Sequence, residues 1–179
     1  MDKQKRNWII FFVIVALVAG YLGVRAILNS DAYLEWKAER IMDDIREFMA
    51  EDVARWQELA EVIRDEAQSR DDKSLYRSEH QSEFPEALDA QVGSMIAGCT
   101  VNFDTVFVDG VTKGGYPEGF CIFRYTIEFD RGVHEFDQGV YAWIDLIYAP
   151  GYDGQTYRPF ARESAHIIGD WYVIKCYGY

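Results

Sequence analysis

An uncharged apolar run near the N-terminus constrains this chain more than any other feature of its sequence. The run extends from Asn7 to Val24 and follows three basic residues, Lys3, Lys5 and Arg6. A run of this length crosses the hydrocarbon core of a bilayer as a single helix, and Arg25 can extend its charged end to the far interface. Because basic residues that flank a span stay on the cytoplasmic side, we expect the remaining chain to be extracytoplasmic.

This run divides the chain into four parts. We predict a cytoplasmic tail (1–7), a transmembrane signal-anchor helix in contact with membrane lipid (8–28), an extracytoplasmic helical segment with a linker (29–94) and an antiparallel sheet (95–179) that forms one domain with the helical segment. The predicted location is the plasma (inner) membrane. A cleaved signal peptide is the alternative, although the run is longer than the apolar region of a usual signal peptide.

A long amphipathic helix is predicted from about Asp31 to Ser69. Its apolar residues recur at steps of three and four or their sums, which places them on one helical face. The other faces are acidic with interspersed arginine, a pattern typical of solvated helix surfaces. Asp52 interrupts the apolar face, and the predicted helix can contain one break. The residues of this face are Ile41, Ile45, Phe48, Trp56, Leu59 and Ile63.

From Met95 onward the apolar pattern changes to alternation, with glycine-rich turns between the alternating segments. Short connections between successive strands favour an antiparallel meander. The polar segment 70–84 is predicted to be a connection, and Pro85 opens a short helix to about residue 92. Helices followed by a mostly antiparallel five-stranded sheet define the α+β class, with the long helix covering one sheet face. The predicted strands are Thr100–Asp109, Phe120–Phe129, Gly139–Tyr148, Thr156–Ile167 and Trp171–Tyr179.

Asp145 stands in the middle of an otherwise apolar strand, and the expected register assigns it to a second, partly polar sheet face. A two-residue turn at Asp153-Gly154 places it opposite Arg162. Turns at Gly169-Asp170 and at Gly132-Val133 would likewise place His166 opposite Val173 and Arg124 beside Tyr141. Alternation then gives one apolar face for the long helix and one face on which aromatic and charged residues gather. This predicted binding face comprises Arg124, Tyr141, Trp143, Asp145, Arg162, His166, Trp171, Lys175 and Tyr177.

Three interpretations of Asp145 compete. It can form a cross-strand ion pair with Arg162, belong to a binding surface, or act in catalysis with His166. Tyrosine, tryptophan and arginine are the residues that interfaces and pockets favour. No second acid or activated nucleophile accompanies Asp145 and His166, so we predict no catalytic residue and no enzymatic activity.

The formal net charge of −12 argues against a nucleic-acid-binding protein. The three cysteines and three histidines lack the spacing of a zinc site, and no metal or cofactor is predicted. In a meander, Cys121 and Cys176 are two strands apart, which is too far for a disulfide. Three free thiols are therefore expected, at Cys99, Cys121 and Cys176.

The predicted domain, a long helix over an antiparallel sheet, resembles NTF2-like or cystatin-like cone-shaped domains. With its tail and single span, the layout is similar to that of inner-membrane subunits of type IV secretion systems. This resemblance implies an interaction or assembly module, an accessory subunit of an envelope complex that meets a protein partner or a second copy of itself. A sensing domain is the alternative, with Arg124, Arg162 and Lys175 binding an anionic or aromatic ligand between Trp143 and Trp171. A pilin-like filament subunit is a further alternative.

Overall fold

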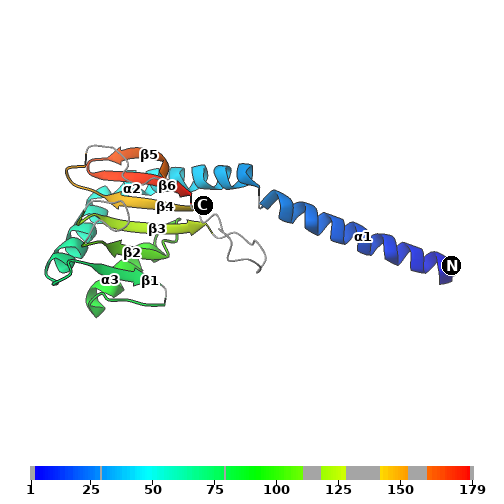
Figure 1. Ribbon diagram of the computed structural model, residues 1–179, viewed down its shortest axis with the longest axis horizontal. Helices are drawn as coiled ribbons and strands as arrows, with labels where there is room; N and C mark the ends of the chain where they lie inside the picture. The colour runs from blue at the N-terminus through cyan, green and yellow to red at the C-terminus, as the bar shows by residue number, and fades with distance from the viewer. Residues whose placement is uncertain are drawn as a thin grey trace.

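The chain is described here by a computed structural model, and the described residues are 3–28, 30–78, 80–110, 118–127, 142–152 and 161–177. Helix α1 (Lys3–Leu28) projects away from the folded domain (Figure 1). Its segment Trp8–Leu28 is long and apolar enough to cross a membrane, and none of its most apolar part is buried inside the protein. This helix is therefore a candidate membrane anchor or signal sequence.

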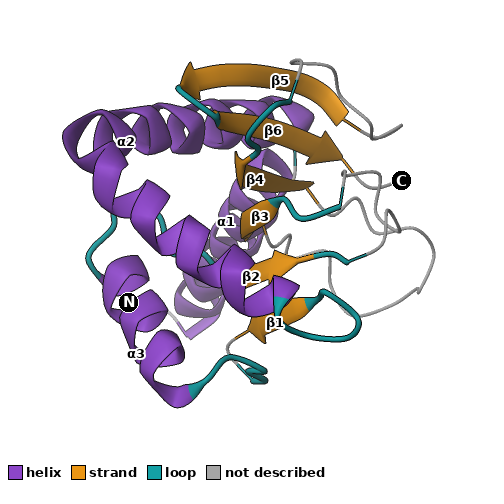
Figure 2. Cartoon of the chain, turned by 90° about the vertical axis from the view of Figure 1, so that its left-hand side faces the viewer, coloured by secondary structure: helices purple, strands orange, loops and turns teal. Residues whose placement is uncertain are grey.

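Helix α2 (Asp31–Gln68) begins directly after α1 and has the predicted bounds. The hydroxyl of Ser30 caps its N-terminus by accepting a hydrogen bond from the Tyr33 amide at 3.3 Å. Asp52 leaves the helical conformation, with φ −145° and ψ 44°, so the helix has a single break where the apolar face is interrupted. Figure 2 shows both halves of α2 on one side of the sheet.

The apolar face of α2 forms the core of the domain together with the inner face of the sheet. The ring of Trp56 packs edge-on against Phe103, Phe123 and Trp171, with centroid distances of 6.0, 5.2 and 6.4 Å. Such aromatic contacts add to the free energy already gained by burying large rings. The predicted helix face is confirmed: Ile41, Ile45, Trp56, Leu59 and Ile63 are buried, and Phe48 is partly buried against them.

The sheet is antiparallel and has the strand order β1-β2-β3-β4-β6-β5. A short helix, α3 (Glu86–Ala97), follows Pro85 and connects β1 to β2. The α+β class is confirmed. The strands are β1 (Leu75–Ser78), β2 (Thr105–Val108), β3 (Cys121–Ile127), β4 (Ala142–Tyr148), β5 (Ala161–Ile168) and β6 (Trp171–Tyr177).

Two parts of the predicted sheet are wrong. Strand β1 lies in the segment predicted to be a connection, because its pairing with β2 outweighs a weak local pattern. The predicted meander is also wrong, since β6 lies between β4 and β5. Strand β6 begins with Trp171, Val173 and Ile174, which are buried on both faces of the sheet. A strand that is apolar on both faces favours a central position, whereas the more polar β5 occupies the edge.

Of the two register shifts between β5 and β6, the one nearer the turn determines which way the first side chains of β6 point. The two-residue turn at Gly169-Asp170 is present as predicted, with Ile168 opposite Trp171. The register then shifts between Ile168 and His166, so His166 faces Tyr172 instead of Val173. Since a slip by one residue exchanges the two faces of a strand, the described side chains of β6, Trp171 to Lys175, point opposite to the prediction.

The same topology separates Asp145 from its predicted partner. Strand β6 places Ile174, not Arg162, opposite Asp145. On the other side, Arg124 of β3 lies directly opposite Asp145, although the prediction placed Arg124 beside Tyr141. The turn predicted at 132–133 and Tyr141 itself lie outside the described residues.

Lys175 of β6 connects the sheet to the beginning of α2. Its side chain is 2% exposed and donates hydrogen bonds to Glu35 Oε1 at 2.7 Å and Glu39 Oε1 at 2.8 Å. A buried ammonium group is tolerated only where carboxylates compensate for its lost hydration. These contacts hold the first turns of α2, which follow the candidate anchor, against the sheet.

We expect Lys175→Met to lower the free energy of unfolding by about 1–3 kcal/mol, less than for a fully buried pair because Glu35 and Glu39 can return to water. Equilibrium denaturation of the full chain in detergent measures this value. Hydrogen exchange should also accelerate at the amides of the first turns of α2.

Lys73→Met provides the matched control. Lys73 binds Glu118 at 3.2 Å, but both side chains are about half exposed, at 51% and 49%. Removing this pair should lower the free energy of unfolding by less than about 1 kcal/mol. Equal losses for the two variants would contradict the proposed role of Lys175.

Candidate functional site

The outer face of the sheet, which points away from α2, is the candidate functional site. Its middle is a buried cluster of aliphatic and aromatic residues that surrounds one ion pair. The buried residues here form a second hydrophobic cluster, with Trp143, Tyr152 and Tyr172 packed against it. The cluster consists of Phe107, Phe120, Ile122, Ile147, Ala149 and Ile174.

One ion pair lies within this apolar face. Arg124 donates from Nε to Asp145 Oδ1 at 2.7 Å and from Nη2 to Oδ2 at 2.8 Å. The planar guanidinium group also lies between two rings, 4.9 Å from the Phe107 centroid and 5.0 Å from that of Trp143. Two parallel hydrogen bonds and two cation–π contacts fix the arginine in one orientation.

The environment of this pair is largely dry. Asp145 is completely buried and the Arg124 side chain is 22% exposed. A carboxylate loses several kcal/mol of hydration at such a position, and its bidentate partner compensates for that loss. The pair therefore serves to fix the register of β3 against β4, and both carboxylate oxygens of Asp145 are occupied by Arg124.

The structure divides the predicted binding-face residues into three groups. Arg124, Trp143 and Asp145 meet on the outer face, and His166 of the edge strand lies against Tyr172 with a centroid distance of 5.2 Å. Trp171 and Lys175 were predicted to lie there but point toward α2, because of the register shift in β5–β6. The side chains of Tyr141, Arg162 and Tyr177 lie outside the described residues.

The proposed ligand site between Trp143 and Trp171 is not formed by these residues, since the two rings lie on opposite faces of the sheet. Trp171 is buried in the core, and its indole nitrogen has no hydrogen-bond partner among the described residues. His166 Nε2 lies 2.7 Å from the Gly169 carbonyl oxygen. His166 thus contacts the β5–β6 turn, whereas Asp145 forms its ion pair with Arg124.

The described cysteines are free thiols, Cys99 partly exposed and Cys121 buried. Burial raises the pKa of both thiols, which keeps them protonated and unreactive at neutral pH. Residue 176 pairs with Trp143 at the opposite end of the sheet from Cys121, and its side chain lies outside the described residues. Among the residues that the structure describes, no three histidine, cysteine or acidic side chains form a group that could hold a metal ion.

A polar contact that was not predicted from the sequence joins the second half of α2 to β4. Tyr148 donates from its hydroxyl to Glu61 Oε1 at 2.9 Å, and the Arg64 guanidinium lies 5.6 Å from the Tyr148 ring centroid. Burial, with Glu61 as a second cause, raises the pKa of Tyr148 to about 12. No periodic signal marks this contact, because its residues lie far apart in the sequence.

A hollow lies beside the edge strand β5. It has a volume of about 210 Å³ and is lined by Arg46 and Ala50 of α2 and by His166, Ile167 and Ile168 of β5. Its walls are apolar at Ala50 and Ile167, while Arg46 and His166 supply polar groups. The hollow opens where the sheet ends, so a segment lying along β5 could place a side chain in it.

No protein-family model, curated protein or solved structure matches this chain. The candidate anchor, the enclosed ion pair and the edge strand with its hollow are accordingly the features from which a function can be inferred.

A double-mutant cycle on Arg124→Met and Asp145→Leu tests the enclosed pair. Each single substitution leaves one charge buried, and we expect a loss of about 3 kcal/mol in the free energy of unfolding. The double variant should lose less free energy of unfolding than the two single variants lose together, and the difference is a coupling energy of about 1–3 kcal/mol. Denaturant titration of all four proteins gives these values.

The same cycle on Arg46→Met and Asp43→Leu is the control. This pair has the same residue types and a 2.6 Å contact, but its side chains are 39% and 72% exposed. A coupling energy below about 0.5 kcal/mol is expected for it. Indistinguishable coupling in the two cycles would show that burial does not strengthen the Arg124–Asp145 pair.

Tyr148 should make the protein sensitive to alkaline pH. Its pKa is about 12 in the folded state, against about 10 for an unfolded tyrosine. The stabilisation is therefore complete below about pH 10 and is lost as the pH rises toward 12. In thermal unfolding followed by circular dichroism, Tyr148→Phe should reduce the decline of Tm over this range. Tyr76→Phe, at an exposed tyrosine, is the control and should decline as the wild type does.

Proposed function

We propose that this chain is a single-pass, membrane-anchored interaction or assembly module, with its folded domain outside the cytoplasm as an accessory subunit of an envelope complex. Helix α1 supplies the anchor, and the Lys175 contacts with Glu35 and Glu39 join the domain to the helix that follows it. The helix-over-sheet layout that resembles NTF2-like domains is part of this proposal.

The difference between the two edges of the sheet is the observation that carries the proposal. The β1 edge is covered by its own chain: Ser78 donates its amide to the Gln81 carbonyl at 2.7 Å, and Glu83 donates to the Tyr76 carbonyl at 2.9 Å. Glu83 also accepts the Tyr76 amide on its side chain. Proteins cover an edge in this way to prevent unwanted strand pairing.

At the β5 edge, the described part of the chain places no further strand beyond β5. The hollow beside Ala50 and Ile167 lies next to this edge. An extended segment of a partner can add to such an edge through backbone hydrogen bonds, while alternate side chains enter the neighbouring hollow. We therefore assign partner docking to the groove formed by β5 and the first half of α2, hereafter the β5 groove.

The orientation of the strands favours a different chain over a second copy as the partner. The strands run roughly along the direction of α1 (Figure 1). Antiparallel pairing of two β5 strands requires a two-fold axis perpendicular to them, which would turn the second α1 the opposite way. Two copies anchored in one membrane cannot pair like this.

Photo-crosslinking in native membranes tests the proposal. A photoreactive residue replaces either Ile168 on β5 or Tyr76 on β1, which are almost equally exposed, at 40% and 39%. We expect a discrete crosslinked species from position 168 and none from position 76, because the described residues cover the β1 edge and leave the β5 edge uncovered.

Filling the hollow supplies the second arm of this test. Ala50→Trp should abolish the crosslink from position 168, since the indole would occupy the space of a partner side chain. Ala54→Trp, at an exposed alanine one helical turn further along α2, should retain it. Equal crosslinking from both edges, or equal effects of both tryptophan substitutions, would contradict docking in the β5 groove.

A further inference from the structure

An aromatic cluster lies at the beginning of α2, where Tyr33 packs against the margin of the hydrophobic core and the neighbouring Trp36 is exposed. Trp36 is 53% exposed, the most exposed of the large apolar side chains that the structure describes beyond α1. Its ring lies 5.6 Å from that of Tyr33, and the Arg40 guanidinium lies 5.8 Å from its centroid. We call Tyr33, Trp36 and Arg40 the Trp36 cluster.

The position of this cluster relative to α1 indicates what covers it. The segment Trp8–Leu28 has 21 residues, or about 31 Å of helix, close to the thickness of the hydrocarbon core. Helix α2 continues in a direction similar to that of α1 (Figure 1). Trp36 follows Leu28 by eight residues, so its backbone lies about 12 Å beyond the end of the apolar segment along the helix axis. Helical side chains tilt toward the N-terminus, which brings the indole back toward the headgroup layer, about 5–8 Å thick on each side.

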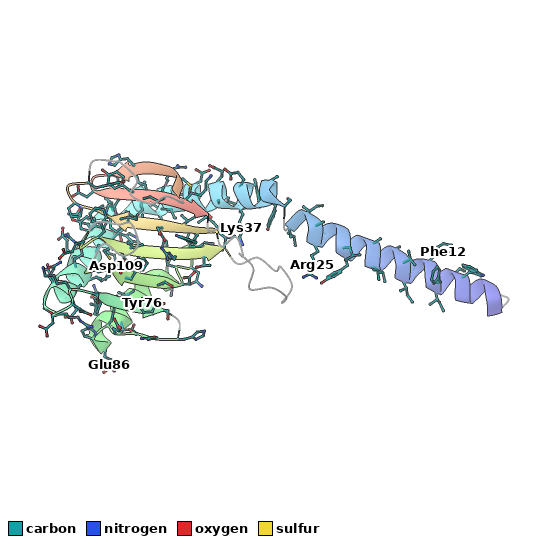
Figure 3. The ribbon with its side chains drawn as sticks, viewed as in Figure 1. Phe12, Arg25, Lys37, Tyr76, Glu86 and Asp109 are labelled. Atoms are coloured by element: carbon teal, nitrogen blue, oxygen red, sulfur yellow. The ribbon has the colours of Figure 1, made fainter. Side chains whose placement is uncertain are left out.

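The chemistry of the cluster suits that layer. Tryptophan and tyrosine favour the membrane interface, where an apolar ring and a polar edge are both solvated. Arg25 and Lys37 lie on either side of the junction between α1 and α2 (Figure 3), and Arg40 adds a third basic group near it. The nearby carboxylates of Glu35 and Glu39 bind Lys175, so they are held toward the sheet. Basic side chains in this position attract lipid phosphate groups.

We propose that the Trp36 cluster is a second membrane contact, seated among the phospholipid headgroups of the bilayer that holds α1. This inference rests on the proposed membrane anchoring. Together with the Lys175 contacts, the cluster fixes the direction in which the folded domain stands on the membrane. The β5 groove then points sideways along the membrane surface, where a neighbouring membrane protein could reach it.

Fluorine NMR of the full chain in phospholipid nanodiscs tests this contact. The tryptophans at positions 8, 36, 56, 143 and 171 are replaced by 5-fluorotryptophan, and Trp36→Phe assigns the resonance of Trp36. The nanodiscs consist of phosphatidylcholine and phosphatidylglycerol, with or without a paramagnetic label on the headgroups. We expect the label to remove most of the peak height of Trp36 and Trp8, while Trp56 and Trp171 in the core keep theirs.

Val62→Trp provides the matched control on the same helix. Val62 is 43% exposed but lies beyond the break at Asp52, so its added resonance should keep its height. A sharp Trp36 resonance beside a broadened Trp8 resonance overturns the second contact and leaves the anchor in place. Sharp resonances at both positions overturn the anchor as well. Equal broadening of Trp36 and the added tryptophan would show only general proximity to lipid and would also overturn the proposal.

Discussion

The packing of α2 against the inner face of the sheet is the interaction on which the rest of the structure depends. Helix α2 contacts strands β1 to β5 and binds Lys175 of β6, and its single break is at Asp52. Trp56 lies just after the break and contacts Phe103, Phe123 and Trp171. One helix therefore covers the inner face of the sheet and also follows directly after α1, so α2 connects the candidate anchor to the core.

Two charge sites determine how the strands fit beneath this helix, and they lie on opposite faces of the sheet. Arg124 and Asp145 join β3 to β4 on the outer face, whereas Lys175 joins β6 to α2 on the inner face. A buried charge without its partner costs several kcal/mol, so any register that separates these groups is penalised. The charges thus favour one pairing among several that the apolar strands alone would permit.

This arrangement relates the proposed function to the fold. The enclosed ion pair belongs to the framework of the outer face, and the surfaces left for a partner are at its margins. The β5 groove lies at one edge, and the Trp36 cluster lies near α1. Because Lys175 holds the first turns of α2, a contact between Trp36 and lipid headgroups would control the orientation of the sheet and of its open edge.

The sequence by itself determined the elements whose signals are local. The apolar run of α1, the apolar stripe and bounds of α2, the Pro85 helix, most strand positions and the α+β class all follow from periodicity over neighbouring residues. The faces of β3 and β4 were also predicted, and so was the placement of Asp145 on the outer face. Its partner was not, because pairing between strands depends on contacts distant in the sequence.

Only the tertiary structure decided the strand order and the direction of the β6 side chains. The apolar beginning of β6 could be buried on both faces only between two other strands, and this placed β5 at the edge. One extra residue between His166 and Ile168 then exchanged the faces of Trp171 and Lys175. A strand alternates with a period of two, so a bulge that no local sequence pattern predicts reverses the faces expected for Trp171 to Lys175.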